Sequence, residues 1–339
     1  MSTSFARLKF FGGITNNPIR RSRYTDFKSV YSVPRRFDHS IAAPETINST
    51  SKSEPLLTIS KNHAPIERFN YSAIQQRLHQ SCLNEFSEKE VRLRVELAAA
   101  YRLFAHFGWT EAIYNHLTVG LTEDDGSKSY LINPLGLRFD EITASSLLKI
   151  DSEGNILHEG VIGDLMGVNR AGWIIHGGIH LARGDSALAV MHSHHNAFTG
   201  ISATVNGFLG ALSQTSETLG EVAEHGFQGM VVDSAERESL AKDLGQKDTM
   251  LLRNHGAITV GKSIGAAWYR MYLAVRAAEI QVAAQSSAAA GGGISLPSTS
   301  TIKTTKEALR FFQQHGDFGQ LEFTAYQRLI DSLDPSYRV

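Results

Sequence analysis

Three histidines at two places in the chain have the spacing and setting of metal ligands. His192 and His194 are two residues apart and follow an apolar run that starts at Leu188, as expected of a buried strand. Residues two apart on a strand project to the same face, so both imidazoles can reach one divalent ion. His255 lies further along the chain between two β-prone runs, and Gly256 after it lets the backbone turn. We therefore expect His192, His194 and His255 to form one metal site.

The alternative is that these histidines are ordinary core residues, because a His-x-His pair alone is a weak pattern. A second pair, His176 and His180, is four residues apart and would share one face of a helix. This pair lacks the glutamate that follows the first histidine in the zinc-protease motif. We expect it to line a cleft or a subunit contact rather than to bind metal.

The composition narrows the class of protein and its partners. Of the 339 residues 42% are hydrophobic, which supports a substantial core, and the net charge of −1 gives no reason to expect a nucleic-acid partner. The single cysteine, Cys82, rules out an internal disulfide and suits a reducing compartment. No apolar run is as long as a membrane span. We expect a cytoplasmic protein.

Residues 1–85 have the composition of an arm rather than of a folded domain. The first 25 residues contain five basic and no acidic side chains, which is typical of a mitochondrial transit peptide. Residues 40–66 are polar and contain three prolines, as linkers do. We expect a disordered arm, with a mitochondrial address as the alternative to a cytoplasmic location.

Residues 86–288 carry the pattern of an α/β domain. Ser87 and Glu90 have the spacing of a capping box at the start of a helix. Strand-like runs that alternate with helices follow, and they indicate a layered α/β fold. These elements include an expected strand over 111–120, a short helix over 142–148, a helix over 168–183 and a strand over 229–233. We expect residues 289–339 to be a flexible linker and a helical tail.

Several motifs, in order along the chain, carry a resemblance to a known family. The main ones are Val168–His176, Ala187–His194 and Leu252–Gly261, with Tyr130–Leu137, Glu141–Leu147 and Ala277–Val282 in support. Together they resemble the class II aldolase/adducin family over roughly residues 88–288. The resemblance implies a three-layer α/β/α sandwich with a central, mostly antiparallel sheet. It also implies a homo-oligomer, often a tetramer, with sites at the subunit interfaces.

The resemblance also assigns roles to individual residues. His192, His194 and His255 match the histidines that hold zinc in the sugar-phosphate aldolases, where the metal polarises a carbonyl. For this protein we expect zinc, with iron or manganese as alternatives. The loops that contain Asn115 and His116, and Asn133 to Gly136, match those that line the substrate pocket. The expected substrate-binding residues are Asn115, Asn133, Gly136 and His176. The expected acid/base residues are His116, Glu141 and Tyr269. Tyr272 is an alternative to Tyr269. For both tyrosines, the alternative to a chemical role is packing in the core.

One position departs from the aldolase pattern. The aldolases place a glutamate shortly before the helix that here contains His176, and the matching residue is Gly172. Adducins and many bacterial relatives also have glycine there, so the chain resembles that branch. We expect a metal-dependent lyase for a small carbonyl, sugar or oxo-acid substrate. The alternative is a non-catalytic adducin-like module; actin binding is not expected, because the tail lacks adducin's lysine cluster.

Overall fold

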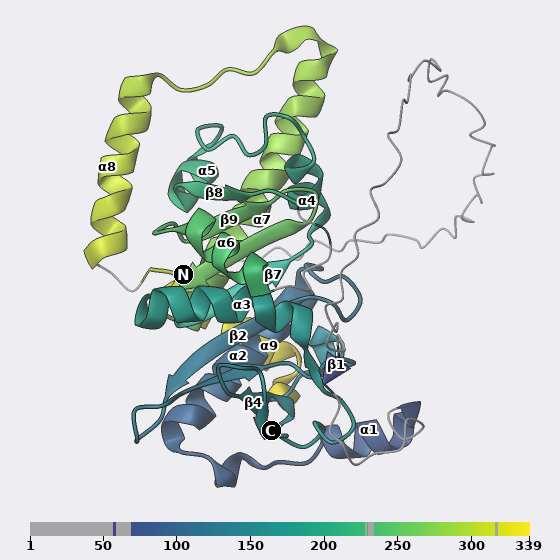
Figure 1. Cartoon of the computed structure of the whole chain (residues 1–339). Coiled ribbons are helices and arrows are strands. Elements are labelled where there is room, and N and C mark those ends of the chain that lie inside the picture. Colours follow the sequence, from purple (N-terminus) through teal and green to yellow (C-terminus); the bar gives the residue numbers. More distant parts are fainter. Residues whose placement is uncertain (1–56, 59–68, 228, 230–233, 316–317) are drawn as a thin grey trace, which may run out of the picture. The chain divides into compact units, whose positions relative to one another are not determined.

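An eight-stranded sheet runs through the part of the chain that the structure describes (Figure 1). The computed structural model describes residues 57–58, 69–227, 229, 234–315 and 318–339. The strand order is β5-β4-β3-β2-β7-β10-β9-β8, and only the pair β8–β9 is parallel. The mostly antiparallel sheet expected from the sequence is therefore confirmed. Its strands are β2 (His116–Thr122), β3 (Lys128–Ile132), β4 (Leu148–Ile150), β5 (Ile156–His158), β7 (Ala189–Ser193), β8 (Val222–His225), β9 (Thr249–Leu252) and β10 (Gly256–Gly261). β1 (Leu57–Thr58) and β6 (Val168–Asn169) form a separate antiparallel pair.

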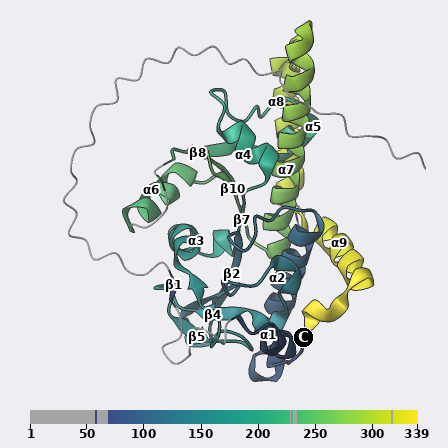
Figure 2. The same cartoon turned by 90° about the vertical axis from the view of Figure 1, so that its right-hand side faces the viewer.

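Helices cover both faces of this sheet (Figure 2). α3 (Arg170–Arg183) and α6 (Ser234–Leu244) lie on one face, and α2 (Glu88–His106) and α7 (Ile264–Ser287) lie on the other. α4 (Asn196–Ser202) and α5 (Gln214–Leu219) pack against α7. The fold is thus the expected three-layer α/β/α sandwich.

Polar side chains start three of the helices that cover the sheet, α2, α7 and α3. Ser87 Oγ accepts a hydrogen bond from the Glu90 amide at 3.2 Å, and Ser263 Oγ accepts one from the Ala266 amide at 3.1 Å. Asn169 caps α3 in the same way. Each cap satisfies an amide that has no partner within its helix, so the sequence fixes where these helices begin.

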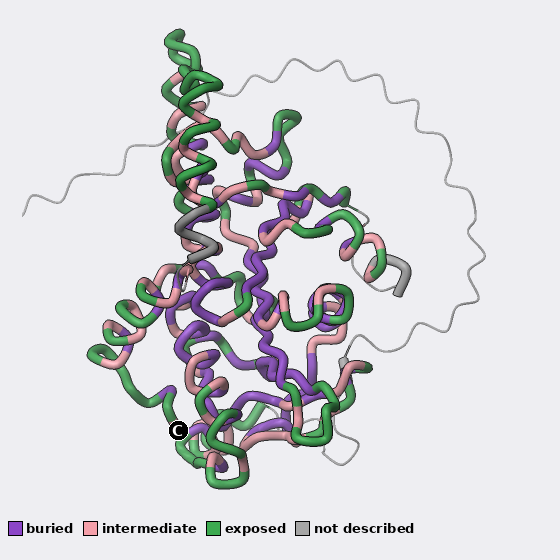
Figure 3. Tube along the Cα trace, turned by 90° about the vertical axis from the view of Figure 1, so that its left-hand side faces the viewer, coloured by how far each residue is buried: buried purple, intermediate pink, exposed green. Residues whose placement is uncertain are grey.

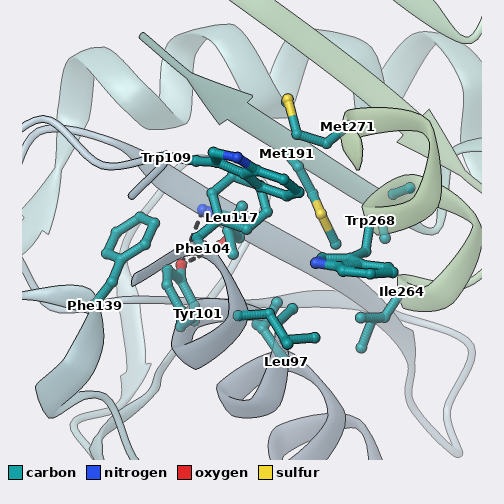
Figure 4. Packing of buried hydrophobic residues seen from close by; sticks show 14 of the residues in the cluster. Leu97, Tyr101, Phe104, Trp109, Leu117, Phe139, Met191, Ile264, Trp268 and Met271 are labelled. Atoms are coloured by element: carbon teal, nitrogen blue, oxygen red, sulfur yellow. Dashed lines mark hydrogen bonds between the residues drawn. The ribbon is translucent and has the colours of Figure 1, made fainter. Parts of the chain in front are cut away.

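The two faces of the sheet bury separate apolar clusters. On the α2 and α7 side, Tyr101 and Phe104 pack among residues of the sheet and of α7, such as Met191 and Trp268 (Figure 4). On the α3 and α6 side the cluster contains Ile175, Ile179, Val190, Ile258 and Val260. All five residues of β7 are buried (Figure 3). β7 is therefore a rigid support for whatever its last residues carry.

The expected N-terminal arm is shorter than residues 1–85. Tyr71–Leu78 form helix α1, which Asn70 caps. Arg77 forms an ion pair with Asp164 at 2.5 Å, and Leu78 is buried. These contacts with the domain fix a segment whose composition alone looks unstructured. Residues 1–56, where we expect an arm or a targeting segment, lie outside the described residues.

The C-terminal segment is helical, as expected, and its last helix packs on the domain. α8 (Thr299–His315) and α9 (Gln320–Leu333) form the helical tail, and α9 packs against α2 and α7. Phe323, Ile330 and Tyr337 are buried in the same cluster as the core of the domain. The end of the chain is thus part of the domain, because the apolar face of α9 covers α2 and α7.

Two smaller expectations were wrong, and one lies outside the described residues. The strand expected over 111–120 begins only at His116, and the helix expected over 142–148 consists of a 3-10 turn at Ala144–Ser146 followed by β4. The strand expected over 229–233 falls on residues that the structure does not describe, apart from Gly229. Among the described residues, no helix is both long and apolar enough to cross a membrane.

Candidate metal centre

The fold brings His192, His194 and His255 together. One ring nitrogen from each lies within 4.8 Å of those of the other two. The ring centroids are 4.5 Å apart for His192 and His194, 4.8 Å for His192 and His255, and 4.6 Å for His194 and His255. We call these three residues the histidine triad.

Two adjacent strands position the triad. His192 is the fourth residue of β7, and His194 follows the end of that strand. β10 pairs with β7 so that Ala257 lies opposite Ser193, which places His255 beside the end of β7. The tight turn before β10 requires glycine, because a Cβ at Gly256 would lie 2.4 Å from the Ser193 carbonyl oxygen.

Hydrogen bonds fix which nitrogen of two triad rings carries its proton. His192 Nδ1 lies 2.9 Å from the Ala257 carbonyl oxygen, which can only accept. His194 Nδ1 contacts a carboxylate oxygen of Glu111. Both rings are therefore protonated at Nδ1 when neutral, and their Nε2 lone pairs face one another at 2.7 Å. Two lone pairs at that distance repel unless a proton or a cation lies between them, so this donor set suits a divalent ion.

Burial favours the neutral, metal-binding form of the imidazoles. Desolvation holds the pKa of His192 well below its ordinary value, and the neighbouring histidines lower it further. Desolvation and His194 lower the pKa of His255 to about 4, although Glu111 opposes this shift. The His194 side chain is 17% exposed, so one side of the triad is open to solvent.

A second group of histidines lies on the α3 side of the sheet, next to the triad. His116 is the cross-strand neighbour of His192, and their ring centroids are 5.0 Å apart. His116 Nδ1 lies 3.0 Å from His176 Nε2, and Thr118 Oγ1 lies 2.8 Å from His176 Nδ1 and 2.7 Å from His180 Nε2. We call His116, His176, Thr118 and His180 the histidine chain. Because His176 is buried with both nitrogens bonded, neither the substrate contact nor the cleft or subunit contact expected for it matches its position.

Asn115 and Asn133, which we expect to line a substrate pocket, are both buried. Asn115 Oδ1 accepts a hydrogen bond from the Glu111 amide at 2.6 Å, while its Nδ2 is buried and has no partner in the described part of the chain. Asn133 Oδ1 accepts a hydrogen bond from the Tyr101 hydroxyl at 2.8 Å, inside the core. Gly136 has a φ of +130° and is packed against Met166, so its immediate role is in the backbone turn.

Two expected acid/base residues have their contacts elsewhere. The Glu141 carboxylate accepts a hydrogen bond from the Arg138 amide at 2.9 Å and so caps a 3-10 turn. The Tyr269 ring packs against Tyr272 and Phe318. The structure therefore brings only His116, of the three expected acid/base residues, into contact with the triad.

Sequence reasoning missed Glu111 and Thr118. Glu111 lies in a turn before β2, and nothing in its spacing links it to His194. Thr118 does have a signal, since it is two residues after His116 and must share its face of β2. Gly172 is explained by the same face: a Cβ there would lie 2.5 Å from Cδ2 of His116. The glycine leaves the space that the His116 ring fills.

Comparison with known proteins places the chain in a family. Residues 95–282 match the family model described as the class II aldolase and adducin N-terminal domain. An adducin-related protein of Schizosaccharomyces pombe is 44% identical over 316 residues, which cover 91% of this chain and 97% of that protein. Alpha-adducin of Rattus norvegicus is 38% identical over 258 residues, 73% of this chain. This chain matches only 34% of alpha-adducin's length.

Solved structures agree with this match. An aldolase II superfamily protein from Pseudomonas syringae has a TM-score of 0.70 and 38% identity, covering 76% of this chain and 98% of that one. An L-fuculose 1-phosphate aldolase from Glaciozyma antarctica PI12 has a TM-score of 0.62 and 27% identity, covering 77% of this chain and 97% of that one. The protein therefore belongs to the class II aldolase and adducin N-terminal domain family.

Proposed function

We propose that this chain is a divalent-metal-dependent lyase of the class II aldolase type, with a small carbonyl, sugar or oxo-acid substrate. The observation that carries the proposal is the pair of facing Nε2 atoms of His192 and His194, 2.7 Å apart. Their Nδ1 protons are committed to Ala257 and Glu111, so both lone pairs remain for a cation. His255 supplies the third nitrogen.

The residues present fit a divalent metal ion. Three neutral imidazoles would supply three nitrogen ligands to a divalent ion, and they would leave its charge unneutralised. Zinc suits such ligands best, and iron or manganese are alternatives. The chemistry that a bound ion supplies is Lewis-acid polarisation of a substrate carbonyl.

The neighbouring side chains have roles that do not depend on which ion is bound. Glu111 orients His194 and increases its basicity as a ligand. Nε2 of His116 has no hydrogen-bond partner among the described residues, and we propose that it accepts or returns a proton of the substrate. Asn115 is the proposed donor to a substrate oxygen, because no described residue accepts a hydrogen bond from its Nδ2.

Metal analysis of the purified full chain tests this proposal. We expect about one divalent ion per chain after loading with zinc, and none in His192→Ala. His106→Ala removes an exposed histidine outside the triad and should keep the ion. A folded wild-type protein that binds no divalent ion after loading would end the proposal. A screen of the loaded protein against hydroxy-aldehydes, oxo-acids and phosphosugars then identifies the substrate.

A second candidate is a non-catalytic, adducin-like binding module. It is favoured by the 44% identity to an adducin-related protein and by glycine at position 172, where the aldolases have an acid. A protein that binds metal but turns over no compound in the screen would support it. Actin co-sedimentation tests adducin-like binding directly, and we expect no binding.

Assembly and location are further parts of the proposal. We propose a cytoplasmic homo-oligomer, with a tetramer as the expected size and mitochondria as the alternative location. Light scattering of the purified chain measures its mass, and a monomer at micromolar concentration would contradict an oligomer. A reporter fused to residues 1–40 that stays diffuse would remove the mitochondrial alternative.

A further inference from the structure

The histidine chain is a continuous line of hydrogen bonds with one fixed end. It runs from His116 through His176 and Thr118 to His180, and His180 Nδ1 ends at the Ala187 carbonyl oxygen, 2.7 Å away. The three rings and the threonine hydroxyl are all buried. The metal chemistry proposed above uses only the first member, His116.

The carbonyl at the fixed end determines the position of every proton in the line. The Ala187 oxygen can only accept, so His180 carries its proton on Nδ1 and presents a lone pair at Nε2. Thr118 must donate its single hydroxyl proton to that lone pair. Its oxygen then accepts from Nδ1 of His176, whose Nε2 in turn accepts from Nδ1 of His116.

This assignment holds because each ring is neutral. All three rings are buried, and desolvation lowers the pKa of His180, at the far end of the line from the triad, to about 4. The Val190 carbonyl oxygen is the other acceptor near Thr118, but it lies 3.5 Å from Oγ1. A bond to Val190 would also leave Nε2 of His180 buried without a donor.

We propose that Thr118 and His180 are positioning residues that hold His116 in the Nδ1-protonated tautomer, through His176. The Nε2 atom of His116 is then a free lone pair beside the triad. This atom makes no hydrogen bond within the described chain, and it is not among the polar atoms that are fully buried without a partner. The edge of the His116 ring that carries Nε2 lies against Gly172, where an added Cβ would be 2.7 Å from Nε2.

The use of this lone pair on a substrate rests on the proposed function, whereas the tautomer itself does not. In the opposite tautomer Nε2 would carry a proton and could not accept one. The buried end of the line thus decides whether Nε2 of His116 can first accept a proton or first donate one. Thr118 and His180 do this without touching the substrate.

Nitrogen-15 NMR of the metal-free full chain, labelled at histidine in a deuterated background, reads the tautomers directly. At pH 7.5 we expect His116, His176 and His180 to carry their protons on Nδ1. Spectra of His116→Gln and His180→Asn assign the signals by loss. An Nε2-protonated His116 in the wild type would overturn the proposal, even if no threonine variant folds.

Two substitutions at one position separate positioning from packing. Thr118→Val keeps the shape but removes the hydroxyl, so Nδ1 of His176 loses its acceptor. We expect the tautomer ratio at His116 to shift by at least roughly fivefold toward Nε2–H, since a buried donor is costly to leave unpaired. Thr118→Ser should restore the wild-type ratio. An unchanged His116 signal in a folded Thr118→Val protein would refute the coupling.

Metal content of the same samples keeps this proposal apart from the proposed function. Nδ1-protonated tautomers in a protein that never binds metal would support the positioning role and end only the lyase proposal. Metal binding together with an Nε2-protonated His116 would end the positioning role and leave the lyase proposal standing.

Discussion

The histidine triad and the histidine chain are adjacent groups of the same residue type, and they differ in where their hydrogen bonds end. In the histidine chain both ring nitrogens of His176 and of His180 have hydrogen-bond partners. The Nδ1 proton of His180 goes to the Ala187 carbonyl oxygen. In the triad the Nδ1 protons of His192 and His194 point outward to Ala257 and Glu111, so the Nε2 lone pairs converge. In both groups a backbone carbonyl can accept the Nδ1 proton, as Ala187 does for His180 and Ala257 for His192. The groups differ at Nε2, which meets a hydrogen-bond donor in the histidine chain and another lone pair in the triad.

The largest effect should separate the two groups by metal affinity. We expect His192→Ala to weaken zinc binding by more than about 100-fold, beyond the losses typical of outer partners. His180→Asn should change affinity by less than about threefold, because His180 does not touch the triad. Titration calorimetry measures both. Equal losses in the two variants would mean that the groups act as one site.

The next effect tests the acceptor behind His194. Glu111→Gln keeps the size of the side chain but removes the charge, and it should weaken zinc binding by about 10–100-fold. Glu238→Gln, an exposed change on α6, serves as the matched control. Wild-type affinity in Glu111→Gln would show that the carboxylate does not support the ligand.

A substitution at Gly172 tests whether the His116 ring needs the space beside it. Gly172→Ala places a Cβ 2.5 Å from the ring, and we expect it to lower the free energy of unfolding by about 1–3 kcal/mol. Gly200→Ala in α4 is the control, since no atom of the described residues lies within 4 Å of the Cβ it would add. Urea denaturation measures both variants. Equal stability of Gly172→Ala and wild type would mean that His116 can move aside freely.

The smallest effect comes from His180, which is buried and neutral in the histidine chain. The pKa of His180 is about 4 in the folded protein, below the ordinary 6.5, so the unfolded chain binds a proton that the folded chain does not. Stability should therefore fall as the pH drops through 6.5 toward 4. His180 alone should cost about 1 kcal/mol between pH 7 and pH 5.5, estimated from linkage. Urea denaturation of His180→Asn at both pH values should show a pH dependence reduced by that amount; an unchanged dependence would contradict a neutral His180.

The sequence by itself determined where several helices begin and which histidines share a face of a strand. The capping residues Ser87 and Ser263 mark the starts of α2 and α7, and strand periodicity puts His192 and His194 on one face. The motifs around these histidines and His255 were enough for the family and for the layered fold. These features are local, since they depend on residues a few positions apart.

Only the tertiary structure decided which partner stands behind each histidine. Glu111 reaches His194 from a turn far along the chain, and Thr118 joins two histidines of α3 because that helix packs on β2. The burial of Phe323 and Ile330, which makes the apparent tail part of the core, is of the same kind. A hydrogen bond or a packed face between distant segments depends on the register of the sheet and the placement of helices on it, and residue spacing carries no record of either.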